Sequence, residues 1–250
     1  MNKEVVFISG ASRGIGTAIA KNFADLGHTV IGTSRSSFTF DTKDKNLIPI
    51  SLDITNRESI AQCMNFLKEN NFTPSVLINN AGITSDQLFL RMKDDEWDNV
   101  IATNLTGTFN LTRALIKGMI KNRYGRIINI SSAHGLTASP YKSAYIAAKH
   151  GVIGLTKTTA LETAEENITA NAICPGYVLT PLVEAQIPDT MRKYDMSREE
   201  VIKKVMLERQ PSRQFASVEQ LGGTCVFFCS DAADQITRTT LSVDGGWTAL

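Results

Sequence analysis

The sequence predicts an α/β fold in which a doubly wound parallel sheet is flanked by helices, in a single domain that covers residues 1–250. Two observations predict it. Short apolar strands alternate with helical patterns along the whole chain, and the first strand runs into a glycine-rich turn. A chain of 250 residues has ample length for one large core, and we see no linker, internal repeat or low-complexity segment.

The N-terminal part carries the most specific unit. A strand at 4–9 leads into the turn 10–16, the helical pattern TAIAKNFADL ends at Gly27, and a second strand covers 28–33. Strand, turn, helix and strand in this order form a βαβ unit. Glycines in such a turn let the backbone approach a pyrophosphate, whose charge is favoured at the helix N-terminus. In this context we favour dinucleotide binding over an ordinary turn.

The alternation continues to the end of the chain. The further expected elements are a strand at 47–52, a helix at 57–69, a strand at 75–78, a long amphipathic helical stretch at 94–121, a strand at 126–131, a helix that begins after Ser143, a strand at 168–173, a helix at 218–229 and a strand at 241–243. Pro49 predicts that the strand at 47–52 lies at a sheet edge, since proline cannot donate to a strand ladder.

Composition excludes several classes of function. Lysine plus arginine number 26 against 25 acidic residues, so we expect no nucleic-acid partner and no anionic membrane surface. No apolar run is long enough to span a membrane, and the N-terminus reaches its glycine turn too early for a signal peptide. The cysteines (Cys63, Cys174, Cys225 and Cys229) lack metal-ligand spacing, so we expect no metal and a reducing, cytoplasmic location.

Ser132, Tyr145 and Lys149 are the candidate catalytic groups. Tyr145 and Lys149 are four residues apart in a helical pattern, so phenol and ammonium can meet on one face. A neighbouring cation favours the phenolate, which suits proton exchange with a carbonyl or alcohol. Ser132 ends an apolar run and could hydrogen-bond the reacting oxygen. A buried tyrosine beside a solvated lysine explains these residues equally well when they are taken alone.

The joint order and spacing of several motifs resembles the short-chain dehydrogenase/reductase family over essentially the full length. These motifs are Gly10-x3-Gly14-x-Gly16, Asn79-Asn80-Ala81-Gly82, Asn104, Ser132, Tyr145-x3-Lys149 and Pro175-Gly176. The resemblance implies a Rossmann-like sheet, with Tyr145 as acid/base and Lys149 lowering its pKa and holding the nicotinamide ribose. It also implies that Ser132 orients the substrate oxygen and that Asn104 keeps a water in a proton relay.

The same resemblance implies a set of cofactor contacts. The residues are Gly10, Ser12, Arg13, Gly14, Ile15, Gly16, Ser34, Arg35, Asp53, Ile54, Asn80, Ala81, Gly82, Tyr145, Lys149, Pro175, Gly176, Val178 and Thr180. Among them Asp53 would contact the adenine and Thr180 the carboxamide. Asn104 as a helix-kinking amide and Asp53 as a helix N-cap remain alternatives.

The end of the second strand bears on the choice of cofactor. An acidic residue there would bind the ribose 2′-hydroxyl and indicate NAD. Ser34 stands at that place, Arg35 follows it, and Arg13 lies in the glycine turn. Two guanidiniums and a hydroxyl suit a 2′-phosphate by charge and geometry, so we predict NADP(H). NAD(H) stays possible through Asp41, and two solvated surface arginines are the other alternative.

The two halves of the chain resemble different relatives within the family. Residues 79–132 resemble the 3-oxoacyl-carrier-protein and acetoacetyl-CoA reductases, and residues 133–250 resemble bacterial D-3-hydroxybutyrate dehydrogenases. The latter resemblance implies a carboxylate clamp of His134, Lys142 and Gln186, with Tyr177 and Trp247 in the same pocket. Each clamp residue alone could be an ordinary polar loop or helix residue. Thr84 and Tyr177 depart from the family pattern, which has glutamine and tryptophan there.

We therefore expect interconversion of a 3-hydroxy acid and its 3-keto acid, D-3-hydroxybutyrate and acetoacetate in particular. A 3-oxoacyl-carrier-protein or acetoacetyl-CoA reductase is the alternative, for which Arg91, Lys117, Lys121 and Arg123 could provide basic surface. A non-catalytic nucleotide-binding member is the alternative of another class. Residues 179–213 predict a mobile lid over the substrate, or else an amphipathic surface helix.

The resemblance also implies a homotetramer. Its interfaces would pair the helices at 94–121 and 144–165 and the C-terminal strand. Small residues at Ala147, Ala148, Gly151 and Gly154 would allow close approach, although internal packing would give the same pattern.

Overall fold

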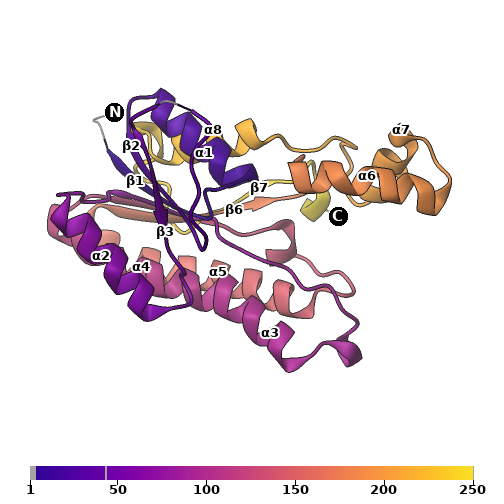
Figure 1. The fold of residues 1–250 in the computed structure, drawn as a ribbon, viewed down its shortest axis with the longest axis horizontal. Coiled ribbons are helices and arrows are strands. Elements are labelled where there is room, and N and C mark those ends of the chain that lie inside the picture. The colour runs from indigo at the N-terminus through magenta and orange to yellow at the C-terminus, as the bar shows by residue number, and fades with distance from the viewer. Residues whose placement is uncertain (1–3, 43, 250) are drawn as a thin grey trace.

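The computed structural model describes residues 4–42 and 44–249, and a seven-stranded parallel sheet runs through its centre (Figure 1). The strand order is β3-β2-β1-β4-β5-β6-β7. The strands are β1 (Val5–Ser9), β2 (Thr29–Ser34), β3 (Leu47–Ser51), β4 (Val76–Asn79), β5 (Gly125–Ile130), β6 (Ile168–Pro175) and β7 (Thr240–Val243). The predicted fold class is confirmed.

Helices cover both faces of the sheet, as parallel strands require. The α-helices are α1 (Gly14–Asp25), α2 (Arg57–Glu69), α3 (Asp94–Ile101), α4 (Gly107–Asn122), α5 (Ser143–Glu162), α6 (Pro181–Tyr194), α7 (Arg198–Glu200) and α8 (Val218–Phe228). Figure 1 shows α1 and α8 on one face and α2, α4 and α5 on the other. Two separate apolar cores result, one centred on Phe23 and Phe228 and the other on Leu77, Leu111 and Met119.

The burial of each strand follows its place in the sheet. Every residue of β4, β5 and β6 is buried, because these strands have neighbours on both edges and helices on both faces. In β3 only the first residue, Leu47, is buried, and the other four are half-buried or exposed. Pro49 lies in this strand, which is at the sheet edge as predicted. The strand order reverses between β1 and β4. In open α/β sheets, ligands bind beyond the carboxyl ends of the strands at such a reversal.

The helical stretch predicted at 94–121 is divided into two helices. A π-helical turn at Ala102–Thr106 separates α3 from α4, which differs from the single stretch expected. Asn104 lies in this turn and bonds with both side-chain atoms to the backbone of Ile83. The π-helical turn therefore places the Asn104 side chain against the loop after β4.

The segment after β6 projects beyond the sheet at the right of Figure 1. It contains α6, α7 and a π-helical turn at Val201–Met206. Its Lys203 and Lys204 each pair with a glutamate four residues earlier, and all four side chains are largely exposed. The solvated face expected for this segment is thus present.

Within the described part of the chain, none of the helices is long and apolar enough to cross a lipid bilayer. The four cysteines are free and buried. The described residues contain no group of three or more histidine, cysteine or acidic side chains arranged for a metal ion.

Candidate active site

The glycine turn between β1 and α1 has a backbone that only glycine adopts readily. Gly10 and Gly14 have φ angles of +69° and +58°. A Cβ atom on Gly16 would lie 2.2 Å from the carbonyl oxygen of Gly10 and 2.7 Å from Nδ2 of Asn80. Gly16 is therefore needed so that the start of α1 can pack against the turn itself.

Asn80 fixes this turn from the neighbouring strand. Its Nδ2 donates to the carbonyl oxygens of Ser9, at 3.2 Å, and Gly10, at 2.8 Å. In return, the Ser9 hydroxyl accepts from the backbone N–H groups of Asn80 and Ala81, both at 3.1 Å. These bonds join the carboxyl ends of β1 and β4 where the strand order reverses.

A cleft of about 570 Å³ opens at this point. Its lining includes thirteen of the predicted cofactor residues: Gly10, Ser12, Arg13, Gly14, Ile15, Ser34, Arg35, Asp53, Ile54, Asn80, Ala81, Gly82 and Thr180. The N-cap of α1, Arg13, makes no side-chain capping bond, and the first turn of the helix holds no acidic residue. Its N–H groups can therefore bind a pyrophosphate, and the cleft fits a dinucleotide.

The polar groups at the far end of the cleft include both arginines. Among the described residues no ion pair is recorded for Arg13 or Arg35, and both are exposed. Asp41 is exposed and lies outside the lining. Asp53 is not a helix N-cap, because Asn56 caps α2 by accepting from the N–H groups two and three residues on. The alternative for Asp53 is thereby removed.

Six predicted cofactor residues lie outside that lining. Gly16 lies in the first turn of α1, Tyr145 and Lys149 lie on α5, and Pro175, Gly176 and Val178 lie at or just after the end of β6. A Cβ on Gly176 would lie 2.5 Å from Oε1 of Gln210, so this glycine admits the loop that carries Gln210. Val178 is buried and pairs with Ala216 in an isolated bridge. Their roles toward a cofactor stay predictions.

The catalytic candidates meet beside this cleft. Ser132 follows the end of β5, and Tyr145 and Lys149 lie on α5. The Ser132 hydroxyl is close enough to the Tyr145 phenol to act on its pKa. Lys149 is buried, its Nζ donates to the carbonyl oxygen of Ile130 at 2.8 Å, and it lies 5.5 Å from the centre of the Tyr145 ring.

The titration of these groups differs from the expectation. Burial raises the pKa of Tyr145, while the neighbouring Ser132 hydroxyl opposes this rise. Burial also lowers the pKa of Lys149 to about 8. Lys149 is not among the groups that shift the pKa of Tyr145, and its ammonium donates to the carbonyl oxygen of Ile130, so the expected lowering of the tyrosine pKa by Lys149 is not found for the protein groups alone.

Asn104 lies close to this pair. Its Oδ1 accepts from the N–H of Ile83 at 2.8 Å and its Nδ2 donates to the same residue's carbonyl at 2.9 Å. A Cβ on Gly82 would lie 3.4 Å from Oδ1 of Asn104 and 3.7 Å from Nζ of Lys149. Amide and ammonium thus border the same space over Gly82.

Aromatic rings form the far wall of the site. Tyr177 stacks on Trp247, with 5.6 Å between centroids and 10° between planes. The ring of His134 meets Trp247 edge-on at 5.0 Å and Tyr145 at 6.1 Å. Burial, and after it the charges of Lys142 and Arg209, lower the pKa of His134 to about 4, so this ring is neutral at pH 7.

The three-residue clamp predicted from the sequence is only partly assembled. His134 and Lys142 both border Tyr145, but Gln186 is exposed on α6 and makes no side-chain hydrogen bond to the described residues. Lys142 is paired with the carboxylate of Asp86. Two facts account for the difference: Asp86, in the loop after β4, occupies the Lys142 ammonium, and α6 leaves the Gln186 side chain exposed.

Asp86 and Arg209 are site residues that sequence reasoning missed. Arg209 donates to the Ser139 hydroxyl at 2.9 Å and to the carbonyl of Ala138 at 3.2 Å. The same hydroxyl bonds Nε2 of His134 at 2.9 Å. Asp86 follows a strand at its carboxyl end, which is a signal for a site residue, but Arg209 gives none because it is one of many charges in the segment.

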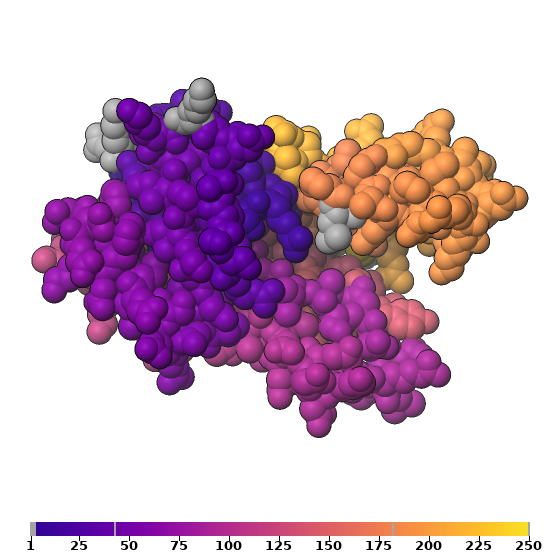
Figure 2. Space-filling model, in the orientation of Figure 1, coloured from indigo at the N-terminus to yellow at the C-terminus, as the bar shows by residue number. Residues whose placement is uncertain are grey.

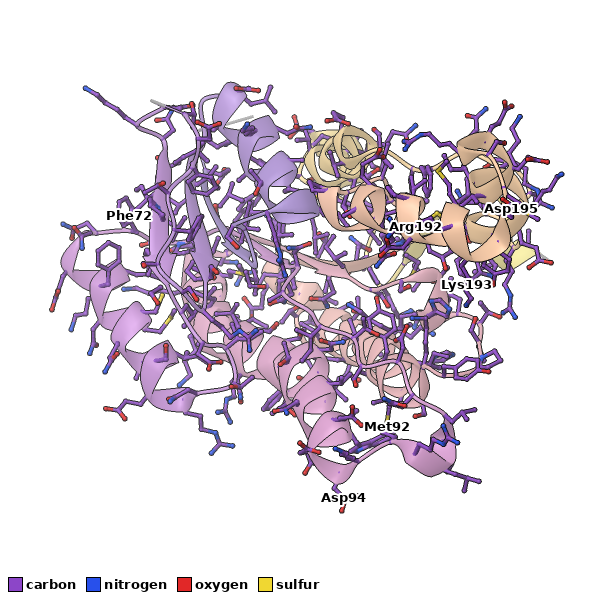
Figure 3. All side chains as sticks on the ribbon, turned by 45° about the vertical axis from the view of Figure 1, so that its right-hand side comes forward. Phe72, Met92, Asp94, Arg192, Lys193 and Asp195 are labelled. Carbon is purple, nitrogen blue, oxygen red and sulfur yellow. The ribbon has the colours of Figure 1, made fainter. Side chains whose placement is uncertain are left out.

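The projecting segment and the rest of the molecule border a hollow. Figure 2 shows this notch between the orange segment with α6 and α7 and the magenta segment with α3. In Figure 3, Arg192, Lys193 and Asp195 mark the outer end of α6, and Met92 and Asp94 mark the opposite side.

Known proteins share this architecture and sequence. A family profile described as short chain dehydrogenase matches residues 4–190. D-beta-hydroxybutyrate dehydrogenase of Rhizobium meliloti is 44% identical, with 100% of both chains covered. 3-Oxoacyl-(acyl-carrier-protein) reductase of Haemophilus influenzae is 37% identical, with 98% of each chain covered.

Among solved structures, ligand-free aldohexose dehydrogenase of Thermoplasma acidophilum superposes with a TM-score of 0.87 at 33% identity, covering 99% of this chain and 95% of that one. Fold, motifs and relatives agree. The chain belongs to the short-chain dehydrogenase family and is an oxidoreductase of that family.

Proposed function

We propose that the protein interconverts D-3-hydroxybutyrate and acetoacetate with a nicotinamide dinucleotide. The observation that carries this proposal is the convergence of Ser132, Tyr145 and Lys149 beside the dinucleotide cleft, facing a pocket walled by His134 and Trp247. The relative from Rhizobium meliloti, named for this substrate, supports it.

Each catalytic side chain has a role that follows from its contacts. Tyr145 gives a proton to the ketone oxygen in reduction and takes it back from the alcohol in oxidation. Ser132, whose hydroxyl is close enough to the phenol to act on its pKa, orients that oxygen. Lys149 and Asn104 border the space over Gly82, through which a proton can reach the phenol. A bound nicotinamide dinucleotide supplies the hydride in reduction and accepts it in oxidation.

For the cofactor we propose NADP(H). Ser34, Arg35 and Arg13 line the cleft together, and neither guanidinium has an ion-pair partner among the described residues. A 2′-phosphate would supply the missing negative charge. A higher kcat/KM with NADH than with NADPH would contradict this choice.

A second candidate is reduction of a 3-oxoacyl thioester, carried by coenzyme A or a carrier protein. Lys142 is paired with Asp86, so its positive charge is already balanced, which favours a substrate without a free carboxylate. The relative from Haemophilus influenzae carries a name of this kind.

We further propose that the molecule is a homotetramer. Ala147, Gly154 and Leu161 lie seven residues apart on an exposed face of α5, and Leu161 is 64% exposed. Leu241 on β7 and Phe227 on α8 are also exposed apolar residues. By contrast, Ala148 is buried and a Cβ on Gly151 would meet Leu105, so those two small residues serve internal packing.

Residues 179–213 are proposed to close over the substrate, since Arg209 of this segment donates to the Ser139 hydroxyl, which bonds His134 next to Tyr145. One assay separates the two substrate candidates. Acetoacetate and acetoacetyl-CoA are compared with NADPH and with NADH as kcat/KM. A preference for the free acid supports the first candidate, and reduction of the thioester alone supports the second.

A further inference from the structure

Two loops that are far apart in the sequence meet beside Tyr145. The N–H of Gln87, in the loop after β4, donates to the carbonyl oxygen of Tyr141 at 2.9 Å. Next to this bond, Asp86 forms its ion pair with Lys142. The backbone bond between Gln87 and Tyr141 holds Asp86 and Lys142 opposite each other. Their ion pair is therefore positioned by the folded backbone.

Both oxygens of Asp86 are engaged. Oδ1 accepts from the Thr84 hydroxyl at 2.5 Å, and Oδ2 accepts from the ammonium of Lys142. The Lys142 side chain is 23% exposed, and its Nζ lies 5.9 Å from the centre of the Tyr145 ring. A cation this close to the acid/base is suited to the carboxylate of a small substrate, but its charge is already balanced.

The charge of Asp86 also reaches the rest of the pocket. It raises the pKa of Tyr145, His134 and Tyr177, in each case as a smaller contribution beside burial. An entering carboxylate therefore meets a like charge as well as a cation that is already paired.

We propose that Asp86 is a specificity-determining residue that disfavours free 3-keto acids relative to uncharged 3-keto esters and thioesters. It acts by holding the Lys142 ammonium. This inference rests on the proposed function, which supplies the class of substrate. Its test measures binding and does not depend on turnover. Part-exposed ion pairs contribute modestly, so we expect an effect of about fivefold on affinity.

The intrinsic fluorescence of Trp247 can report binding in the pocket. The protein has two tryptophans, and a Trp97→Phe background leaves Trp247, which lies against His134 and Tyr177. Tryptophan fluorescence is titrated with butyrate and with methyl butyrate, in saturating NADP+ and again in NAD+. Butyrate carries a negatively charged carboxylate where methyl butyrate carries an uncharged ester.

Asp86→Asn should tighten butyrate binding about fivefold and leave methyl butyrate binding unchanged. Adding Lys142→Met to this variant should return butyrate affinity to near the parent value. Asp86→Ser, which keeps a hydroxyl beside Thr84, should repeat the Asn result. Glu166→Gln removes a carboxylate that pairs with Arg123 at 3.4 Å and should change neither titration.

Unchanged or weaker butyrate binding in Asp86→Asn, an equal gain for the ester, or a gain that survives in the double variant would each overturn the proposal. Parallel turnover assays use acetoacetate and methyl acetoacetate with the parent protein. If neither is reduced, the proposed function fails, and the fluorescence titration still decides the role of Asp86.

Discussion

The proposed cofactor cleft and the proposed substrate pocket lie side by side but are built in different ways. Around the cleft, positive φ angles at Gly10 and Gly14 and the bonds from Asn80 shape the backbone itself. In the pocket, polar side chains come from separate loops, where Asp86 forms an ion pair with Lys142 and Arg209 donates a hydrogen bond to Ser139. We therefore expect the cleft to tolerate few substitutions, and the binding properties of the pocket to change with single side-chain substitutions.

Tyr145 stands between the two regions, and its loss should have the largest effect. Tyr145→Phe removes the proton donor and should lower kcat by about a thousandfold, near 4 kcal/mol of transition-state stabilisation. The cleft does not depend on the hydroxyl, so the dissociation constant for NADPH, measured by calorimetry, should stay within about twofold of the parent value. A kcat within tenfold of the parent would remove the acid/base role and reopen the interpretation as a nucleotide-binding member without activity.

The cleft should be the less tolerant region when one methyl group is added. Gly16→Ala places a Cβ 2.2 Å from a carbonyl oxygen that cannot move far, and overpacking of this kind costs about 3 kcal/mol or more. We expect a lower free energy of unfolding in urea and a loss of dinucleotide binding. The matched control is Gly223→Ala in α8, where a Cβ would meet nothing within 4 Å. A stable Gly16→Ala variant that binds NADPH normally would contradict the distinction between the regions.

The same distinction explains what the sequence could predict. The strands, the glycine turn and the order of Ser132, Tyr145 and Lys149 follow from local patterns, and they lie where expected. Local patterns also specify the edge position of β3, through its proline.

The pocket could not be predicted to the same depth. The pairing of Asp86 with Lys142 joins residues 56 positions apart, and no spacing rule links them. Gln186 was expected in the clamp because of the sequence around it, yet α6 holds it in solvent. The sign of the Tyr145 pKa shift depends on burial, which the i, i+4 spacing of phenol and ammonium does not reveal.

The protonation of His134 shows how strongly the pocket disfavours a positive charge on this ring. Its pKa is lowered to about 4, by burial first and then by Lys142 and Arg209, with Asp86 opposing. Between about pH 6.5 and pH 4 the unfolded chain binds a proton at this histidine that the folded protein does not, so the free energy of unfolding falls as pH falls. The full effect is on the order of 3 kcal/mol.

His134→Gln removes that titration and can still hydrogen-bond Ser139. Urea unfolding of both proteins at pH 7 and pH 4.5 should show a smaller loss for the variant. An equal loss in the two proteins would mean that His134 is protonated in the fold or is more exposed than it is in the structure.

The smallest effect is expected at the end of the projecting segment. Arg209 bonds the loop 138–139, and through Ser139 it contacts His134, so Arg209→Gln should loosen the segment over the pocket. Hydrogen bonds of this kind are worth about 1 kcal/mol, which corresponds to about a fivefold rise in KM for acetoacetate with a smaller change in kcat. Arg192→Gln is the control, because Arg192 is 79% exposed on the same segment and pairs only with Asp189 among the described residues. If both variants raise KM equally, the effect comes from charge on the segment as a whole, and Arg209 has no specific role in holding it over the pocket.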